Sequence, residues 1–249
     1  MDDRILGVLG GMGPLAGAEF MRRLTLLTPA TLDQDHVPAI LWSDPRIPPR
    51  TNGRPTGALD PLPWMRCAIA GLEQAGCGAI AIACNNAHGW YPDLIATSGV
   101  PILHIVDAAA ADLRRIGVIS GPVGLMATQA TLDLRLYQDR LEALGYICLL
   151  PTAAEMTGQV TPAIAAVKAN RPADGFEPLA QVAQNLTARG AACVVLGCTE
   201  IPLAMQTGQL DLTLVDTIDA LARAAIAWAK PGKQGEGSAP RPSQGAGPV

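Results

Sequence analysis

Long apolar runs, basic stripes and paired cysteines are all missing from this sequence. No apolar run reaches the roughly 18–20 residues that a membrane-spanning helix needs, so we expect no contact with a membrane. The formal net charge is −4 and no basic stripe is present, which argues against nucleic acid as a partner. The first residues include two acids and their apolar run is cut by glycines, unlike a signal peptide, so we expect a cytoplasmic protein.

The cysteines and histidines also lack the spacings that mark disulfide frameworks and zinc sites. The six cysteines contain no Cys-x-x-Cys pair and lie in apolar surroundings, as expected of reduced thiols in a chain of 249 residues. The three histidines, His36, His88 and His104, stand at no zinc-ligand spacing from them. We therefore expect neither disulfides nor a metal site.

Aromatic residues are scarce, so the core has to be built from smaller apolar side chains. Only 4% of residues are aromatic, whereas 49% are hydrophobic and 16% are charged, which favours a core of Ala, Leu, Ile and Val. The length allows one large domain or two of about 100–120 residues. Residues 231–249 are rich in Gly, Pro and Ser and nearly free of large apolar residues, which predicts a disordered tail.

Short apolar runs alternate with amphipathic stretches along the chain, which is typical of an α/β fold with mainly parallel sheets. The predicted strands are Ile5–Leu9, Ala39–Trp42, Ala79–Ala83, Ile102–Ile105, Ile116–Ile119, Tyr146–Leu150, Cys193–Leu196 and Thr213–Val215. The predicted helices are Leu15–Leu27, Pro61–Ala75, Asp107–Arg114, Val123–Leu144, Ala153–Lys168, Gly175–Arg189 and Thr217–Ala229.

An internal echo indicates two similar halves. The segment Gly7–Gly11 (GVLGG) resembles Gly117–Gly121 (GVISG), and Ile82–His88 (IACNNAH) resembles Leu196–Pro202 (LGCTEIP), at nearly equal offsets. Each half then places a cysteine at the end of an equivalent strand. The alternative is that α/β chains repeat such Gly-Val turns by chance.

The glycines after the first strand fit the dinucleotide fingerprint, since Gly11, Gly13 and Ala16 match G-x-G-x-x-G/A. A dinucleotide fold also needs an acidic residue about 20 residues further on, at the end of the second strand. The acid at that strand end is Asp44, which lies well beyond this spacing. The spacing therefore argues against a nicotinamide enzyme.

Cys84 and Cys198 each follow an apolar strand and precede a helical stretch. Ligands of open α/β sheets bind at the carboxyl ends of the strands, and a helix N-terminus there favours a thiolate by lowering the pKa of the thiol. Asn85, Asn86 and Thr199 add short polar groups that can bind a carboxylate. Two facing cysteines suit inversion of a carbon centre, because one removes a proton and the other returns one to the opposite face. Such chemistry needs no metal and no pyridoxal cofactor.

Four segments together resemble the aspartate/glutamate racemase superfamily, in particular its cofactor-independent aspartate racemase branch. They are Gly7–Ala16 (GVLGGMGPLA), Asp44–Thr51 (DPRIPPRT), Cys84–His88 (CNNAH) and Gly197–Pro202 (GCTEIP), in family order over most of the chain. The resemblance implies two pseudo-symmetric α/β domains with the active site in the cleft between them. Residues 1–105 plus about 212–230 would form the first domain, and residues 106–211 the second.

The resemblance also implies roles for particular residues. Cys84 and Cys198 would be the two acid/base residues, and the opening loop with Gly11 and Met12 would shape the substrate site. Arg50, followed by Thr51, matches a family segment that resembles a carboxylate clamp, which suits the planar fork of an arginine. Lys168 falls where related sequences carry a substrate-facing lysine, and a surface lysine at a helix end explains it nearly as well. Glu200 would orient the site or carry negative charge near the thiol, and His88 would reach the thiol or simply pack.

The remaining implications concern cofactors, partners and alternatives. The resemblance implies no cofactor, an amino-acid substrate and a homodimer. Asn86 replaces the threonine usual in the family, which leaves the identity of the substrate open, while Gly10-Gly11-Met12 replaces the Asp-Ser motif of glutamate racemases. The alternative functions are a decarboxylase or cis–trans isomerase of dicarboxylic acids on the same scaffold, or a non-catalytic small-molecule binder.

Overall fold

Two parallel four-stranded sheets form the framework of the protein, in a computed structural model that describes residues 4–50 and 57–231. The first sheet has the order β2-β1-β3-β4 and the second the order β6-β5-β7-β8. The strands are β1 (Ile5–Gly10), β2 (Ala39–Ser43), β3 (Cys77–Ile82), β4 (Ile102–Leu103), β5 (Gly121–Met126), β6 (Tyr146–Leu149), β7 (Val194–Leu196) and β8 (Leu214–Asp216). The predicted α/β class with two similar parallel sheets is confirmed.

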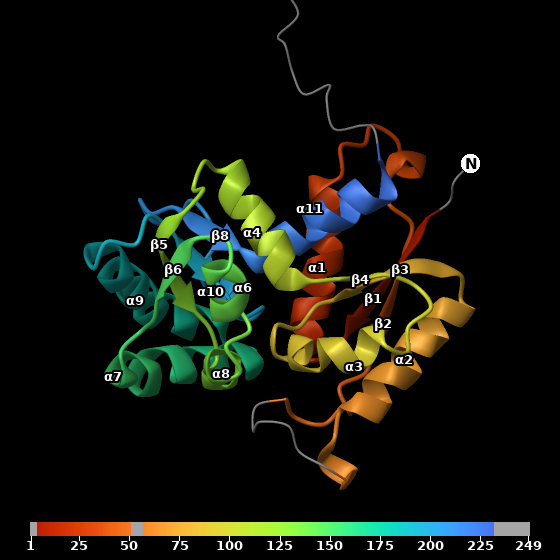
Figure 1. Ribbon diagram of the computed structural model, residues 1–249, viewed down its shortest axis with the longest axis horizontal. Coiled ribbons are helices and arrows are strands. Elements are labelled where there is room, and N and C mark those ends of the chain that lie inside the picture. The colour runs from red at the N-terminus through yellow and green to blue at the C-terminus, as the bar shows by residue number, and fades with distance from the viewer. Residues whose placement is uncertain (1–3, 51–56, 232–249) are drawn as a thin grey trace, which may run out of the picture.

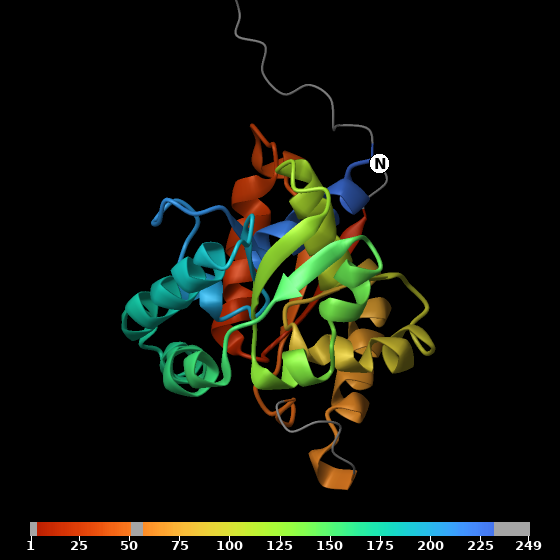
Figure 2. The ribbon, with the colours of Figure 1, turned by 60° about the vertical axis from the view of Figure 1, so that its left-hand side comes forward.

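Helices cover both sheets. They are α1 (Pro14–Leu27), α2 (Leu62–Gln74), α3 (Tyr91–Ile95), α4 (Ile105–Arg115), α5 (Gln129–Asp133), α6 (Gln138–Glu142), α7 (Ala153–Glu155), α8 (Thr161–Lys168), α9 (Phe176–Ala188), α10 (Ile201–Ala204) and α11 (Thr217–Ala229). Figure 1 shows the first sheet on the right and the second on the left, with α1, α4 and α11 between them. In both views α8 and α9 (green to teal) lie on the side away from α2 (orange) (Figures 1 and 2).

The alternation of side chains along β1 explains how the first sheet is sandwiched. Leu6 and Val8 are fully buried in the cluster that holds Phe20 and Leu24 of α1. Leu9 points to the other face and joins the cluster of α2. Because successive strand residues face opposite sides, a run that is apolar throughout requires cover on both faces.

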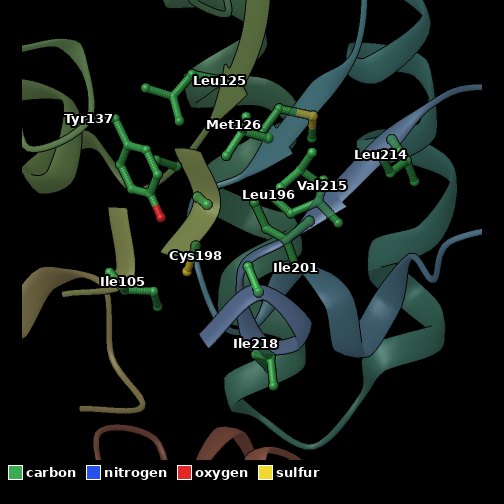
Figure 3. Packing of buried hydrophobic residues seen from close by; sticks show 14 of the residues in the cluster. Ile105, Leu125, Met126, Tyr137, Leu196, Cys198, Ile201, Leu214, Val215 and Ile218 are labelled. Carbon is green, nitrogen blue, oxygen red and sulfur yellow. The ribbon is translucent and has the colours of Figure 1, made fainter. Parts of the chain in front are cut away.

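One continuous hydrophobic core joins the two sheets. The cluster that begins at β1 and α1 continues through α4 and α11 into β5, β7 and β8 (Figure 3). Because protein interiors are densely packed, this shared core holds the two sheets in a fixed position relative to each other. The carboxyl ends of their strands are therefore held in a defined geometry.

The two halves repeat the same strand order, and the two cysteines occupy equivalent places in it. Leu9 of β1 pairs with Ile82 of β3, two residues before Cys84. Met126 of β5 pairs with Leu196 of β7, two residues before Cys198. The expectation of a cysteine at the end of an equivalent strand in each half is therefore confirmed.

The predicted strand Ile116–Ile119 is wrong. These residues close α4 in a Schellman motif, in which the N–H of Gly117 donates to the carbonyl of Arg114 (3.1 Å) and that of Val118 to Leu113 (3.0 Å). Gly117 has a φ of 85°, as the motif requires, and Ile119 is 72% exposed. The glycine echo between Gly7–Gly11 and Gly117–Gly121 therefore does not mark equivalent strands.

The predicted helix Val123–Leu144 is also wrong, because its first residues belong to β5 and the rest divides into α5 and α6. Gly124 lies in the strand because α9 packs closely on it: a Cβ there would stand 3.1 Å from the Cβ of Leu186. Thr128 caps α5 by accepting from the N–H of Thr131 (3.2 Å), and Arg135, with a φ of 50°, interrupts the helical path before α6.

The last strand and helix connect the two halves. β8, which falls in the range we assigned to the first domain, pairs with β7 and so belongs to the second sheet, whereas α11 packs against α1 and α4. The division into domains stays a prediction. Within residues 4–50 and 57–231 no helix is long and apolar enough to cross a membrane. The predicted disordered tail lies outside the described residues, except for its first residue, Pro231.

Candidate active site

Cys84 and Cys198 line one small cavity between the two halves. Its volume is about 20 Å³, and both thiols are nearly buried, with 5% and 4% of their surface exposed. We call it the thiol cavity. Its lining consists of Met12, Arg50, Cys84, Asn85, Asn86, Thr128, Lys168, Cys198, Thr199 and Glu200. The structure thus brings together the carboxyl ends of β1, β3, β5 and β7, and Figure 3 shows Cys198 just beyond Leu196 at the end of its strand.

A larger cavity of about 560 Å³ adjoins the thiol cavity and shares Met12, Arg50, Lys168 and Glu200 with it. Gly11 lines only this outer cavity. A Cβ on Gly11, whose φ is 86°, would lie 2.4 Å from the backbone nitrogen of Asp44, so only glycine fits there. Thr51 lies outside the described residues.

Cys198 is held by a neighbouring carboxylate. Its Sγ donates to Oε2 of Glu200 at 3.0 Å, and Glu200 is itself buried. Burial and the charge of Glu200 raise the pKa of Cys198 well above its usual range, although Lys168 opposes this weakly. We expected a helix N-terminus to lower the pKa of Cys198. The backbone N–H of Glu200, at the N-cap of the four-residue α10, does lower it, but burial and the Glu200 carboxylate outweigh this effect.

His88 packs beside Cys84 but does not reach its sulfur. The N–H of Ile105 donates to Nε2 of His88 (3.2 Å), so Nδ1 carries the proton and donates to the carbonyl of Cys84 (3.0 Å). Burial lowers the pKa of His88 to about 4, which keeps the ring neutral. His88 therefore fixes the main chain at Cys84 and is not a base for the thiol.

Asn86 joins the two halves. Its Oδ1 accepts from the hydroxyl of Thr128 at 2.7 Å and from that of Thr131. Because both lone pairs of this oxygen are used, the amide nitrogen is the group that Asn86 offers to the thiol cavity.

Arg50 lines the thiol cavity, but its terminal nitrogens are bound to main-chain carbonyls. Nη1 donates to Pro48 (2.7 Å) and Ile47 (3.2 Å), and Nη2 donates to Met12 (3.0 Å). Nε is buried and makes no hydrogen bond with the described residues. Arg50 therefore fastens the loop after β2 to the loop after β1, and the role of carboxylate clamp stays a prediction.

Lys168 lines three neighbouring cavities. It ends α8 and lines the thiol cavity, the outer cavity and a groove of about 260 Å³ that also touches Thr128. Lys168 therefore faces the interior of the site in addition to solvent. Thr199 lies beside Glu200, with its hydroxyl 3.4 Å from Oε2.

Sequence reasoning missed Thr128 and Tyr137. Thr128 lines the thiol cavity and follows β5, so it sits at a strand end like the other lining residues. A correct boundary for β5 would have pointed to it. Tyr137 is fully buried and contacts Asn85, but no motif in the sequence marks it.

Comparisons with known proteins place this geometry among racemases. The model of the Asp/Glu/hydantoin racemase family matches residues 9–225. Aspartate racemase from Picrophilus torridus is 30% identical, with a TM-score of 0.81, over 91% of this chain and 94% of that one. The broad specificity amino-acid racemase RacX of Bacillus subtilis (strain 168) is 24% identical over 89% of this chain and 96% of its own length. An aspartate racemase homologue from Pyrococcus horikoshii OT3 shares the fold, with a TM-score of 0.74 at 23% identity over 91% and 99% of the two chains.

The fold and these relatives define an isomerase of the racemase class. More particularly, the chain belongs to the Asp/Glu/hydantoin racemase family. The resemblance drawn from the four sequence segments is thereby confirmed.

Proposed function

We propose that this protein racemises aspartate or a closely related acidic amino acid without a cofactor, using Cys84 and Cys198 as its two acid/base residues. The observation that carries the proposal is that both thiols, from equivalent strand ends, line one cavity. Inversion at a carbon needs two such groups on opposite faces. The aspartate racemase similarity supports the same substrate class. A homodimer stays a prediction of the resemblance, and a cytoplasmic location stays a prediction from the first residues of the sequence.

The charges around the thiol cavity match an acidic amino acid. Arg50 and Lys168 are cations and Glu200 is an anion among its lining residues. Aspartate carries two carboxylates and one ammonium group, the opposite pattern. Complementary charges of this kind give specificity in sites that exclude water. Asn85, Asn86 and Thr199 supply neutral hydrogen-bonding groups.

The proton transfers balance within the two thiols and the substrate. One cysteine, as the thiolate, takes the proton from Cα, and the electron pair of the broken C–H bond remains on the substrate carbanion. The other cysteine, as the thiol, gives its proton to the opposite face, and a new C–H bond forms. The two cysteines have then exchanged protonation states. The raised pKa of Cys198 favours its thiol form, which is the form that donates a proton.

Incubation in D₂O tests the proposed function. A racemase replaces the α-proton of aspartate or glutamate with deuterium and produces the other enantiomer, which NMR and chiral chromatography detect. A binder would do neither, and a decarboxylase would release CO₂. A panel of further amino acids would show whether the substrate range is narrow or as broad as the name of RacX indicates.

Replacing Glu200 with Gln should lower the pH at which Cys198 ionises. The carboxylate disfavours the thiolate by its charge and by accepting the thiol proton, and an amide removes the charge. Thiolate absorbance near 240 nm, measured against the matching Cys198→Ala proteins, gives the titration of this one thiol. Glu177→Gln makes the same charge change on the exposed start of α9 and should leave the titration unchanged. An unshifted titration in Glu200→Gln would contradict the role of Glu200.

A further inference from the structure

Tyr137 reaches from the second half of the chain to the residue beside Cys84. It lies between α5 and α6, is fully buried, and its hydroxyl donates to Oδ1 of Asn85 at 2.5 Å. Figure 3 shows its ring entering the core with the hydroxyl directed toward the side of Cys198. Burial also raises the pKa of Tyr137, so the hydroxyl stays protonated and available as a donor.

The orientation of the Asn85 amide follows from the single hydroxyl proton of Thr217. The hydroxyl of Thr217 donates its only proton to the carbonyl of Leu196 at 2.8 Å. Thr217 can therefore only accept from Asn85, so the atom 3.4 Å from its oxygen is the amide nitrogen Nδ2. The amide oxygen then faces Tyr137, which must be the donor.

This chain of contacts links the two strand ends that carry the thiols. Asn85 follows Cys84, and Leu196 precedes Cys198 by two residues, with Thr217 of α11 between them. Asn85 also lines the thiol cavity. One N–H of the Asn85 amide donates to Thr217, and the second N–H takes part in neither of the two hydrogen bonds of this network.

We propose that Tyr137 is a positioning residue, which holds the Asn85 amide so that its second N–H points into the thiol cavity and donates to a substrate carboxylate. The inference rests on the proposed function. Without the phenol hydroxyl the amide keeps only the long contact of its Nδ2 with Thr217 (3.4 Å), which holds this orientation weakly. A flipped amide would set its oxygen against the carboxylate, which repels it. Tyr137 therefore acts on substrate binding through Asn85, not on the proton transfers.

Replacing Tyr137 with Phe should raise KM for the acidic amino acid about tenfold, the effect of one hydrogen bond, and leave kcat within about twofold. Tyr146→Phe is the matched control. It removes another phenol hydroxyl of the second half, which donates to the carbonyl of Val118 at 2.9 Å and takes no part in the contacts of Asn85 described above. Its KM should equal that of the wild type. Equal KM values in Tyr137→Phe and wild type would overturn the proposal.

A double-mutant cycle separates positioning from general destabilisation. If Tyr137 acts through Asn85, then Tyr137→Phe should not raise KM further in the Asn85→Ala background. An additional rise of the same size there would overturn the proposal. NMR of the free protein gives a readout that needs no activity. The slowly exchanging hydroxyl proton of Tyr137, assigned by its loss in Tyr137→Phe, should shift or vanish in Asn85→Ala. An unchanged signal would show that Tyr137 does not hold Asn85.

The two readouts also distinguish failure of this inference from failure of the proposed function. A wild-type protein that racemises neither aspartate nor glutamate contradicts the proposed function, and with it the claim that the amide serves their carboxylates. The NMR signal would still decide whether Tyr137 orients Asn85. An active wild type with an unchanged Tyr137→Phe variant contradicts only the positioning role.

Discussion

Replacing either Cys84 or Cys198 with Ala should abolish racemisation in both directions. A proton must leave one face of Cα and return to the other, so one thiol cannot complete the reaction. General acid–base groups contribute about 10²–10⁴-fold to a rate, so we expect the racemisation rate of each variant to fall by at least the upper end of this range, to below detection. Serine should also fail, because its hydroxyl is far less acidic than a thiol. Polarimetry or chiral chromatography from each pure enantiomer measures the loss.

Cys193→Ala is the control for this pair of variants. Cys193 is a buried thiol directly before β7 and is not among the residues that line the thiol cavity. Its removal should leave turnover near that of the wild type. In D₂O, each single variant can retain some exchange for the one enantiomer that its remaining thiol can deprotonate. Near-wild-type racemisation by either the Cys84 or the Cys198 variant would contradict the two-base mechanism.

Sequence periodicity located most of the fold because the strands form short apolar runs, of which β1, β3, β7 and β8 are largely buried on both faces. Seven of the eight predicted strands match β1 to β4 and β6 to β8 with ends that differ by at most two residues. The eighth predicted strand, Ile116–Ile119, is not a strand, and β5 nearby was missed because Gly121, Pro122 and Gly124 break its apolar pattern. Gly117 and Ile119 nearby imitate a strand but serve as a helix cap and an exposed loop. In β5 the close packing of α9 requires a glycine at position 124, so the strand does not show an apolar periodicity there.

The sequence predicted those residues of the candidate site that lie just after the end of a strand. Cys84 and Cys198 each stand two residues after the last residue of β3 and β7, and Asn85, Asn86 and Thr199 beside them line the same cavity. Tyr137 could not be found in this way, because it reaches Asn85 from a part of the chain 52 residues away, through tertiary packing. The raised pKa of Cys198 was missed for a related reason, since it depends on burial and on a contact with Glu200.

The glycine motif shows how one pattern serves different folds. In a dinucleotide site such glycines let the backbone approach a pyrophosphate. Here the space beside Gly11 is filled by the backbone of Asp44, so the close approach is to the protein's own chain. That approach brings the loop after β2 against Met12, where Arg50 fastens it. The glycine thus places Arg50 at the thiol cavity.

Replacing Arg50 with Lys should lower kcat/KM about tenfold to a hundredfold while the protein stays folded. The planar fork of arginine makes two parallel bonds to a carboxylate, and losing one charge-assisted bond accounts for a change of this size. In the free protein the same fork binds the carbonyls of Pro48 and Met12, which a single ammonium group cannot reproduce. Arg66→Lys, which changes an exposed arginine of α2 that contacts Asp93, is the control and should leave kcat/KM unchanged.

The choice of substrates shows which carboxylate Arg50 binds. If the fork holds the side-chain carboxylate, then Arg50→Lys should lower kcat/KM for aspartate far more than for alanine, where turnover of alanine is measurable. If it holds the α-carboxylate, both substrates should lose equally, because both carry that group. Lys168 would then be the cation at the other carboxylate, since it lines the same cavity. An Arg50→Lys variant with wild-type kinetics on both substrates would limit Arg50 to fastening the loop, and would leave carboxylate binding to Lys168, Asn85 and Asn86.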